Sequence, residues 1–286
     1  MKNFKISAIL FLLLIGVFSC QKHAITYNTE KVDKDQAEFQ LHYVVPVTAS
    51  SDNNIYRVEI NDQLYANKKA PLNTYNAVPS GAVGRFYATP AGETNIKLYK
   101  GEDEVLVYDQ NCELKPGKQN IFVYDFDEPP VIIDNDYPYE RLVSDSTGKT
   151  AWVKFYNFLF ESENTPTPLT IQYQYQYVNN ENDTKDTSDW ISLGEPVAFG
   201  ESTDWVPVPV YKTVERSSGY AKIDYRIFEV NADGSLGDTL KVLNSSGNMV
   251  NYSDWWNAYV GRRYHHILSG MRIEKPVSAV RQFTAL

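Results

Sequence analysis

Short segments in which apolar and polar residues alternate constrain the fold of this chain more than any other feature. The alternation is clearest at residues 57–61, 95–99 and 170–177. Because successive side chains of a β-strand point to opposite faces, each segment predicts a strand with one buried and one solvated face. Turn residues such as Pro90-Ala-Gly92 separate these segments, and beyond residue 19 no stretch keeps a helical apolar period over three turns. The sequence therefore predicts an all-β fold made of sandwiches.

One segment, residues 151–160, is apolar on nearly both of its faces. A strand that is covered by another layer on each side has this pattern. We therefore expect a central strand here, with Trp152 and Phe155 in the core.

The first twenty residues predict export. Lys2 and Lys5 precede an apolar run, residues 6–18, that is shorter than the roughly 20 apolar residues needed to cross a bilayer. The run ends at Ser19-Cys20 and resembles the lipobox of bacterial lipoproteins. We therefore predict a signal peptide over residues 1–19, lipid on Cys20, and an outer-membrane location at the cell surface or periplasmic face. The alternative is an ordinary secretory signal with an unmodified cysteine.

Charge and cysteine content exclude several classes of protein. The formal net charge of −9 becomes −11 when Lys2 and Lys5 leave with the signal peptide. An acidic surface argues against nucleic acid as a partner, since nucleic-acid binding needs a basic footprint. Two cysteines in a secreted chain of this length cannot form a disulfide scaffold. We interpret Cys112 as a small half-buried side chain and not as a nucleophile.

Length and an internal repeat predict two domains. The chain beyond the signal peptide is longer than an ordinary single sandwich. Residues 37–43 can be aligned with residues 151–157. The segment around Gly117 can be aligned in the same way with the segment around Gly261. The predicted segments are a lipidated polar tether over 20–36, a first domain over 37–130, a linker over 131–149, and a second domain over 150–286 with longer loops and an insertion around 244–256.

The order of these motifs resembles one family. A first strand, then Pro90-Ala-Gly92 before an extended strand, then Leu114-Lys-Pro-Gly117 before a closing strand are similar to an uncharacterised β-sandwich family. Its members occur, often in tandem, in surface lipoproteins of Gram-negative gut and environmental bacteria. The first unit resembles the family more closely than the second. The resemblance implies tandem immunoglobulin-like domains and a surface role sometimes labelled cell adhesion, and it implies no catalytic residues.

Acidic residues gather where the two domains should meet, which raises the question of a calcium site. Calcium takes six to eight oxygen ligands. The segment lacks the Asp-x-Asp-x-Asp-Gly loop pattern, and Pro129-Pro130 more simply forms a stiff spacer. We therefore expect no metal or other cofactor, with calcium as the one weak candidate. Its ligands would be Asp125, Asp127, Glu128, Asp134 and Asp136.

Tryptophans form the candidate ligand site. Exposed flat rings suit sugars, because a pyranose ring presents an apolar face of C–H groups to the π-face of the ring. Tyr173, Tyr175 and Tyr177 also share one strand face, but aromatic residues make up 14% of the chain, so most of them must be core. Trp255-Trp256 is the first choice, since it lies in the expected insertion. The possible ligand-binding residues are Trp255, Trp256, Trp190 and Trp205.

Other motifs point to structure and not to chemistry. His265 and His266 lie opposite Ile121 and Phe122 in the glycine-based alignment, and adjacent histidines on a strand point to opposite faces, so they cannot easily ligate one metal. The triplets Asp145-Ser-Thr147 and Asp238-Thr-Leu240 resemble the O-glycosylation acceptor of some Gram-negative exported proteins, and plain turns explain them equally well.

Enzyme motifs are missing from the sequence. It contains no Gly-x-Ser-x-Gly elbow and no glycine-rich phosphate loop, and its carboxylate pairs lie in no recognisable setting. The sequence therefore predicts a non-enzymatic, membrane-anchored surface lipoprotein for adhesion or assembly, with a cell-surface protein or glycan as partner. Two alternatives stay open: a glycan-binding subunit of an outer-membrane nutrient uptake system, and a structural spacer. An exposed aromatic platform favours glycan, and a long unpaired edge strand favours assembly by strand addition.

Overall fold

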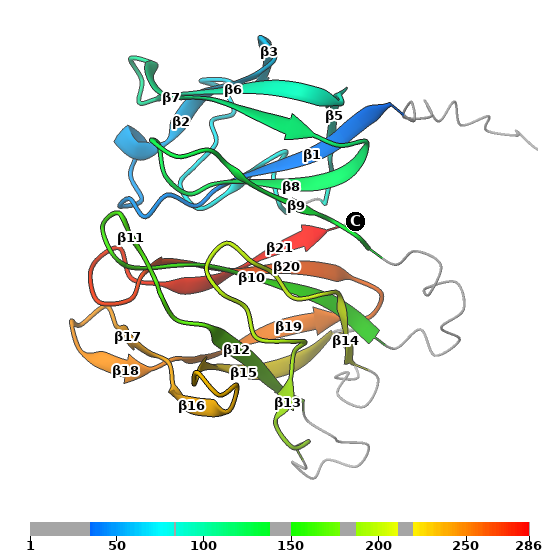
Figure 1. The fold of residues 1–286 in the computed structure, drawn as a ribbon, viewed down its shortest axis with the longest axis vertical. Helices are drawn as coiled ribbons and strands as arrows, with labels where there is room; N and C mark the ends of the chain where they lie inside the picture. The colour runs from blue at the N-terminus through cyan, green and yellow to red at the C-terminus, as the bar shows by residue number, and fades with distance from the viewer. Residues whose placement is uncertain (1–34, 83, 138–149, 178–186, 211–219, 286) are drawn as a thin grey trace, which may run out of the picture. The chain divides into compact units, whose positions relative to one another are not determined.

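Strands form the regular structure of this chain, as Figure 1 shows. The computed structural model describes residues 35–82, 84–137, 150–177, 187–210 and 220–285. In these ranges it contains strands β1 to β21, one 3-10 turn at Ser51–Asn53 and no α-helix, so none of the described residues belongs to a helix that could cross a membrane. The all-β prediction is confirmed, and the layered sheets are consistent with a β-sandwich. The predicted signal peptide and Cys20 lie outside the described residues.

The first half of the chain forms two sheets around one apolar core. Its strands are β1 (Gln36–Tyr43), β2 (Ile55–Ile60), β3 (Gln63–Ala66), β4 (Ala77–Val78), β5 (Tyr87–Pro90), β6 (Gly92–Lys100), β7 (Val105–Leu114), β8 (Gly117–Val123) and β9 (Val131–Asp134). Sheet 1 has the order β4-β1-β8-β9, with β5 also paired to β1, and sheet 2 has the order β3-β2-β6-β7. Phe39 and Leu41 of β1 meet Ile96 and Leu98 of β6 in the core between the sheets.

The second half repeats this arrangement. Its strands are β10 (Thr150–Ser162), β11 (Thr165–Pro166), β12 (Ile171–Tyr177), β13 (Ile191–Ser192), β14 (Val206–Pro209), β15 (Tyr220–Val230), β16 (Leu236–Thr239), β17 (Lys241–Leu243), β18 (Met249–Asn251), β19 (Ser253–Tyr259), β20 (Arg263–Met271) and β21 (Ala279–Ala285). Sheet 3 has the order β11-β10-β20-β21, with β14 also paired to β10. Sheet 4 has the order β13-β12-β15-β16, with β19 also paired to β15, and β17 and β18 form a separate hairpin.

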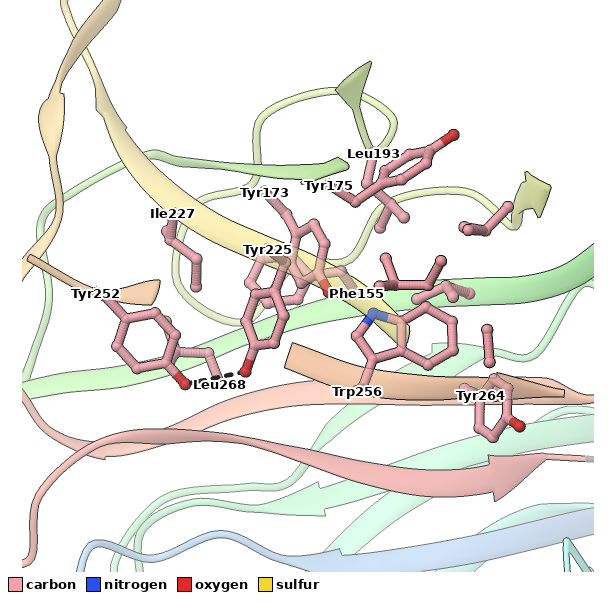
Figure 2. Close-up of a cluster of buried hydrophobic side chains, with 14 of the residues drawn as sticks. Phe155, Tyr173, Tyr175, Leu193, Tyr225, Ile227, Tyr252, Trp256, Tyr264 and Leu268 are labelled. Atoms are coloured by element: carbon pink, nitrogen blue, oxygen red, sulfur yellow. Dashed lines mark hydrogen bonds between the residues drawn. The ribbon is translucent and has the colours of Figure 1, made fainter. Parts of the chain in front are cut away.

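Aromatic side chains fill the core between sheets 3 and 4. Figure 2 shows Phe155, Tyr173, Tyr225 and Trp256 converging there from β10, β12, β15 and β19. The rings of Tyr173 and Tyr225 stack with centroids 4.8 Å apart, and the hydroxyls of Tyr225 and Tyr252 lie 3.3 Å apart within hydrogen-bond distance. Offset and edge-on ring contacts of this kind add to the free energy gained by burying the rings.

The internal repeat predicted from the sequence corresponds to matching strand pairs, with one correction. The first strand of each half lies parallel to a later strand, β1 to β8 and β10 to β20. Leu41 pairs with Ile121, and the residue that matches Leu41, Phe155, pairs with His266. His266 therefore corresponds to Ile121 and His265 to Asn120, so the glycine-based alignment was wrong by one residue. A shift of one residue moves each side chain to the opposite face of its sheet.

Two predicted boundaries were also wrong in part. The linker expected over residues 131–149 begins inside sheet 1, because Val131–Asp134 forms β9 and pairs with β8. The insertion of the second half lies earlier than expected, since β16, β17 and β18 occupy its place between β15 and β19. Trp255 and Trp256 belong to β19, which pairs with β15 as β7 pairs with β6.

Sheets 1 and 3 pack face to face, as the second and third layers of Figure 1 show. The rings of Phe122 and Phe158 stack with centroids 4.4 Å apart and planes inclined by 23°. This contact explains the segment that is apolar on both sides: Val153 and Phe155 of β10 face sheet 4, while Tyr156 and Phe158 face sheet 1. The buried residues of this inter-sheet contact are Val44, Ala77, Phe122, Tyr156, Phe158, Ile267 and Phe283.

A chain of buried polar groups crosses the same contact. The His42 Nε2 atom donates to Asn120 Oδ1 at 3.3 Å, and Asn120 Nδ2 donates to Asn135 Oδ1 at 3.4 Å. The Nε2 atom of His265 donates to the same Asn135 oxygen at 3.1 Å. All four side chains are at most 1% exposed. Because an unsatisfied buried polar group is costly, this network favours one arrangement of the two halves.

Burial of the histidines makes folding stability depend on pH. Desolvation lowers the pKa of His42 from 6.5 to about 4, opposed by its hydrogen bond to Asn120, and lowers the pKa of His266 to about 3. Between these values and about 6.5 the unfolded chain binds protons that the folded chain excludes. The free energy of unfolding is therefore highest above pH 6.5 and falls as the pH drops toward 4.

We predict that His42 alone accounts for a loss of about 3 kcal/mol between pH 7 and pH 4, on the scale of about 1.4 kcal/mol per pKa unit. Urea unfolding at several pH values measures this loss. His42→Phe keeps the ring that stacks on Phe122 at 4.8 Å and removes the titrating group, so its loss should be smaller by that amount. Equal losses in the two proteins would show that His42 does not titrate in this way.

Candidate functional site

The structure separates the four candidate tryptophans into two pairs. Trp256 is only 5% exposed, and its ring meets His266 edge-on at 4.8 Å inside the core of Figure 2. Trp205 is 7% exposed and packs against Tyr137, with its indole N–H donated to the Asn135 carbonyl oxygen. These two side chains are mainly part of the packed interior and support the fold. Trp255 is 52% exposed and Trp190 is partly exposed.

Trp255 and Trp190 lie on the solvent side of sheet 4. Alternation along β12, β15 and β19 turns Tyr173, Tyr225 and Trp256 into the core, so the residues between them point outward. Asp224 pairs with Trp255 on one side and with Gln176 on the other. We call this outward surface of sheet 4 the aromatic face. It comprises Trp190, Trp255, Phe228, Lys222, Asp224, Arg226, Gln174 and Gln176.

Cationic side chains hold the rings of the aromatic face in place. The guanidinium carbon of Arg226 lies 4.1 Å from the Trp190 ring centroid and 4.7 Å from that of Phe228. The same guanidinium donates to Gln174 Oε1 at 3.2 and 3.0 Å. On β15, Lys222 Nζ lies 5.5 Å from the Trp255 ring centroid. Such contacts restrict the rings before any ligand arrives, which lowers the entropy lost on binding.

A pocket of about 370 Å³ adjoins the aromatic face. It lies where β19, the outermost strand of sheet 4 on this side, approaches β20 and β21 of sheet 3, and we call it the edge pocket. One wall comes from the first half of the chain, since the Thr284 amide donates to the Gly81 carbonyl oxygen at 2.7 Å. The lining residues are Gly81, Ala82, Trp255, Trp256, Asn257, Tyr259, Arg262, Tyr264, Gln282 and Thr284.

Gly81 is required by this close approach. A Cβ atom at that position would lie 2.1 Å from the Cδ1 atom of Phe283, well inside contact distance. Phe283 belongs to the contact between sheets 1 and 3, so the loop of the first half is fitted against the second half. The sequence around Gly81 does not reveal this contact, because Phe283 lies some two hundred positions later in the chain.

The five carboxylates proposed for calcium do not converge. Asp125 Oδ1 accepts from the Asp127 amide at 2.9 Å in a local turn, and Asp134 Oδ1 accepts from Gln119 Nε2 at 2.7 Å. The Lys115 Nζ atom also lies 3.9 Å from the Oδ2 atom of Asp134 and forms an ion pair with it. Among the described residues, no group of three or more His, Cys, Asp or Glu side chains could hold a metal ion. The geometry therefore gives no support to calcium at this place.

The remaining candidate residues of the sequence take structural positions. His265 points into the contact between sheets 1 and 3, and His266 into the core of the second half, so the two imidazoles lie on opposite faces as alternation requires. Cys112 is partly buried against the first core, and burial raises its pKa to about 11, so a thiolate is disfavoured at neutral pH. Asp145-Ser-Thr147 lies outside the described residues.

Strand β7 presents a long edge. It pairs with β6, and within the described part of the chain no strand pairs with its other side. β7 has ten residues, and Val105 and Leu106 at its start are 58% and 48% exposed. An edge of this length can template the addition of a further strand.

Comparisons with known proteins give no family for this chain. Neither a protein-family model nor a curated protein matches it. Among solved structures, a match is found to one described as the Bacillus anthracis TIE protein, with 9% sequence identity and a TM-score of 0.23. The match covers 83% of this chain and 34% of that chain, so this chain spans about a third of that protein's length. A similarity this distant says nothing about function.

Proposed function

We propose that this chain is a non-enzymatic, lipid-anchored surface protein whose paired immunoglobulin-like modules serve adhesion by binding glycans on the aromatic face. The single observation that carries the proposal is the pair of partly exposed tryptophans, Trp255 and Trp190, on a sheet face whose other residues, apart from Phe228, are polar. The parallel pairing of the first strand with β8 in one half and β20 in the other supports the immunoglobulin-like topology.

The chemistry of the aromatic face suits a sugar. A tryptophan ring offers a flat apolar surface to the C–H face of a pyranose. Asp224 pairs with Trp255 and Gln176 pairs with Asp224 on the next strand, and these two side chains supply acceptors and donors for the hydroxyl groups. Capture of glycans for nutrient uptake would use the same surface as adhesion to them, and a structural spacer would need no such surface.

We predict that Trp255→Ala weakens glycan binding by about tenfold, because the loss of one stacking ring is of the order of 1.4 kcal/mol. Screening on a glycan array followed by titration calorimetry measures the change. Trp255→Phe should keep most of the affinity, since it retains a flat ring. Met249→Ala is the matched control, because Met249 is 44% exposed on the β17–β18 hairpin and lies outside the aromatic face. An affinity of Trp255→Ala equal to that of the wild type would refute the proposal.

A second role, assembly by strand addition, is favoured by the free edge of β7. Main-chain hydrogen bonds along its ten residues would supply the affinity, and exposed Val105 and Leu106 would add apolar contact. The two roles use different sheets, since β7 belongs to sheet 2 and the aromatic face to sheet 4. One protein can therefore carry both.

We predict that Cys20→Ser moves the protein from the membrane fraction to the soluble fraction, because acyl chains on Cys20 supply the attachment. Cell fractionation measures the distribution, and Cys112→Ser serves as the matched cysteine control. Intact mass spectrometry of the wild type should show loss of residues 1–19 and added acyl mass. A wild-type protein in the cytoplasm with Met1 retained would contradict the lipoprotein assignment.

A further inference from the structure

We infer that the edge pocket binds an acidic group, so that the preferred glycan of this protein carries a carboxylate or a sulfate. This inference rests on the proposed function and deepens it, since it names the class of sugar. The aromatic face and the edge pocket share Trp255. One oligosaccharide can therefore stack on the ring and place its neighbouring unit in the pocket.

The charge of the pocket lining differs from that of the protein as a whole. The chain has 36 acidic and 27 basic residues, and its formal net charge is −9. The lining of the edge pocket contains Arg262 and neither an aspartate nor a glutamate. A basic, acid-free pocket on an acidic protein gives a local site for an anion where the surroundings repel one.

Arg262 is available to a ligand. It is exposed, and among the described residues no carboxylate lies within ion-pair distance of it. Other arginines of the surface are already engaged, since Arg57 pairs with Glu59 and Arg272 pairs with Glu161. An arginine without an acidic partner keeps its full charge and most of its donors for a bound anion.

The guanidinium of Arg262 is held in place by rings. Its central carbon lies 4.2 Å from the Tyr259 ring centroid, and the Tyr264 hydroxyl lies beside it. A stacked guanidinium keeps its N–H groups in one plane, which matches the two oxygens of a carboxylate or two oxygens of a sulfate. The site is therefore oriented before the ligand binds.

Polar groups around Arg262 suit the rest of a sugar. Asn257 on β19 and Gln282 and Thr284 on β21 line the same pocket and offer amide and hydroxyl groups to sugar hydroxyls. The arrangement combines one fixed cation, neutral hydrogen-bonding groups and an adjoining flat ring. These are the elements that an acidic sugar needs and that a neutral apolar ligand does not.

The experiment compares acidic and neutral members of matched oligosaccharide pairs with the full lipidated chain in detergent. The probes are galacturonate oligomers and their methyl esters, sialyllactose and lactose, and a sulfated oligosaccharide with its desulfated form. We expect the wild type to bind the acidic member of at least one pair about tenfold more tightly, and this preference to shrink as salt is raised. The carboxylate and sulfate pairs show which anion is preferred.

Arg262→Gln tests the role of the guanidinium. It should bring the acidic-to-neutral ratio of affinities close to one, whereas Trp255→Ala should weaken binding of both members. Arg85→Gln is the control for charge alone, because Arg85 is an exposed arginine of the first half. Equal binding of both members by the wild type, or an unchanged ratio in Arg262→Gln, would overturn the inference while leaving glycan binding standing. Binding of no glycan by the wild type would overturn the proposed function and the inference together.

Discussion

The face-to-face contact between sheets 1 and 3 is the constraint on which the rest of this structure depends. It buries the face of sheet 3 that points away from sheet 4, and it joins two sheet pairs through the stacked rings of Phe122 and Phe158. Because sheets 1 and 3 cover each other, the outward surfaces of sheets 2 and 4 are left for other contacts. The edge pocket also depends on this contact, since Gly81 of the first half is fitted against Phe283 of the second.

The contact also contains polar side chains, and these restrict the arrangement in which the two halves can pack. His42, Asn120, Asn135 and His265 form one hydrogen-bonded chain in a fully buried place. An apolar contact alone would tolerate sliding of one sheet over the other, whereas a displaced network would leave buried donors and acceptors without partners. These four polar side chains, whose burial is not apparent from the sequence, therefore fix how the two halves meet.

Much of the fold could be predicted from local patterns, and the site could not. Alternation located the strands, and the two-sided apolar run of residues 151–160 located β10. The same alternation could have shown that only one of Trp255 and Trp256 faces solvent. The edge pocket is different, because Gly81 of the first half meets Arg262 and Thr284 of the second half only through the packing of sheets 1 and 3. The alignment that placed His265 opposite Ile121 was wrong by one residue for another reason. Gly117 and Gly261 hold different positions relative to the paired strands, and the pairing is not visible in the sequence.

Scanning calorimetry of the full chain tests most directly whether this contact unites the two halves. We expect one unfolding transition for both halves together, with equal calorimetric and van't Hoff enthalpies. Phe122→Ala, which removes one ring of the central stack, should lower the stability of that whole transition by about 3–5 kcal/mol. Two separate transitions, with Phe122→Ala affecting only the first half, would show that the halves fold independently and that this contact does not unite them.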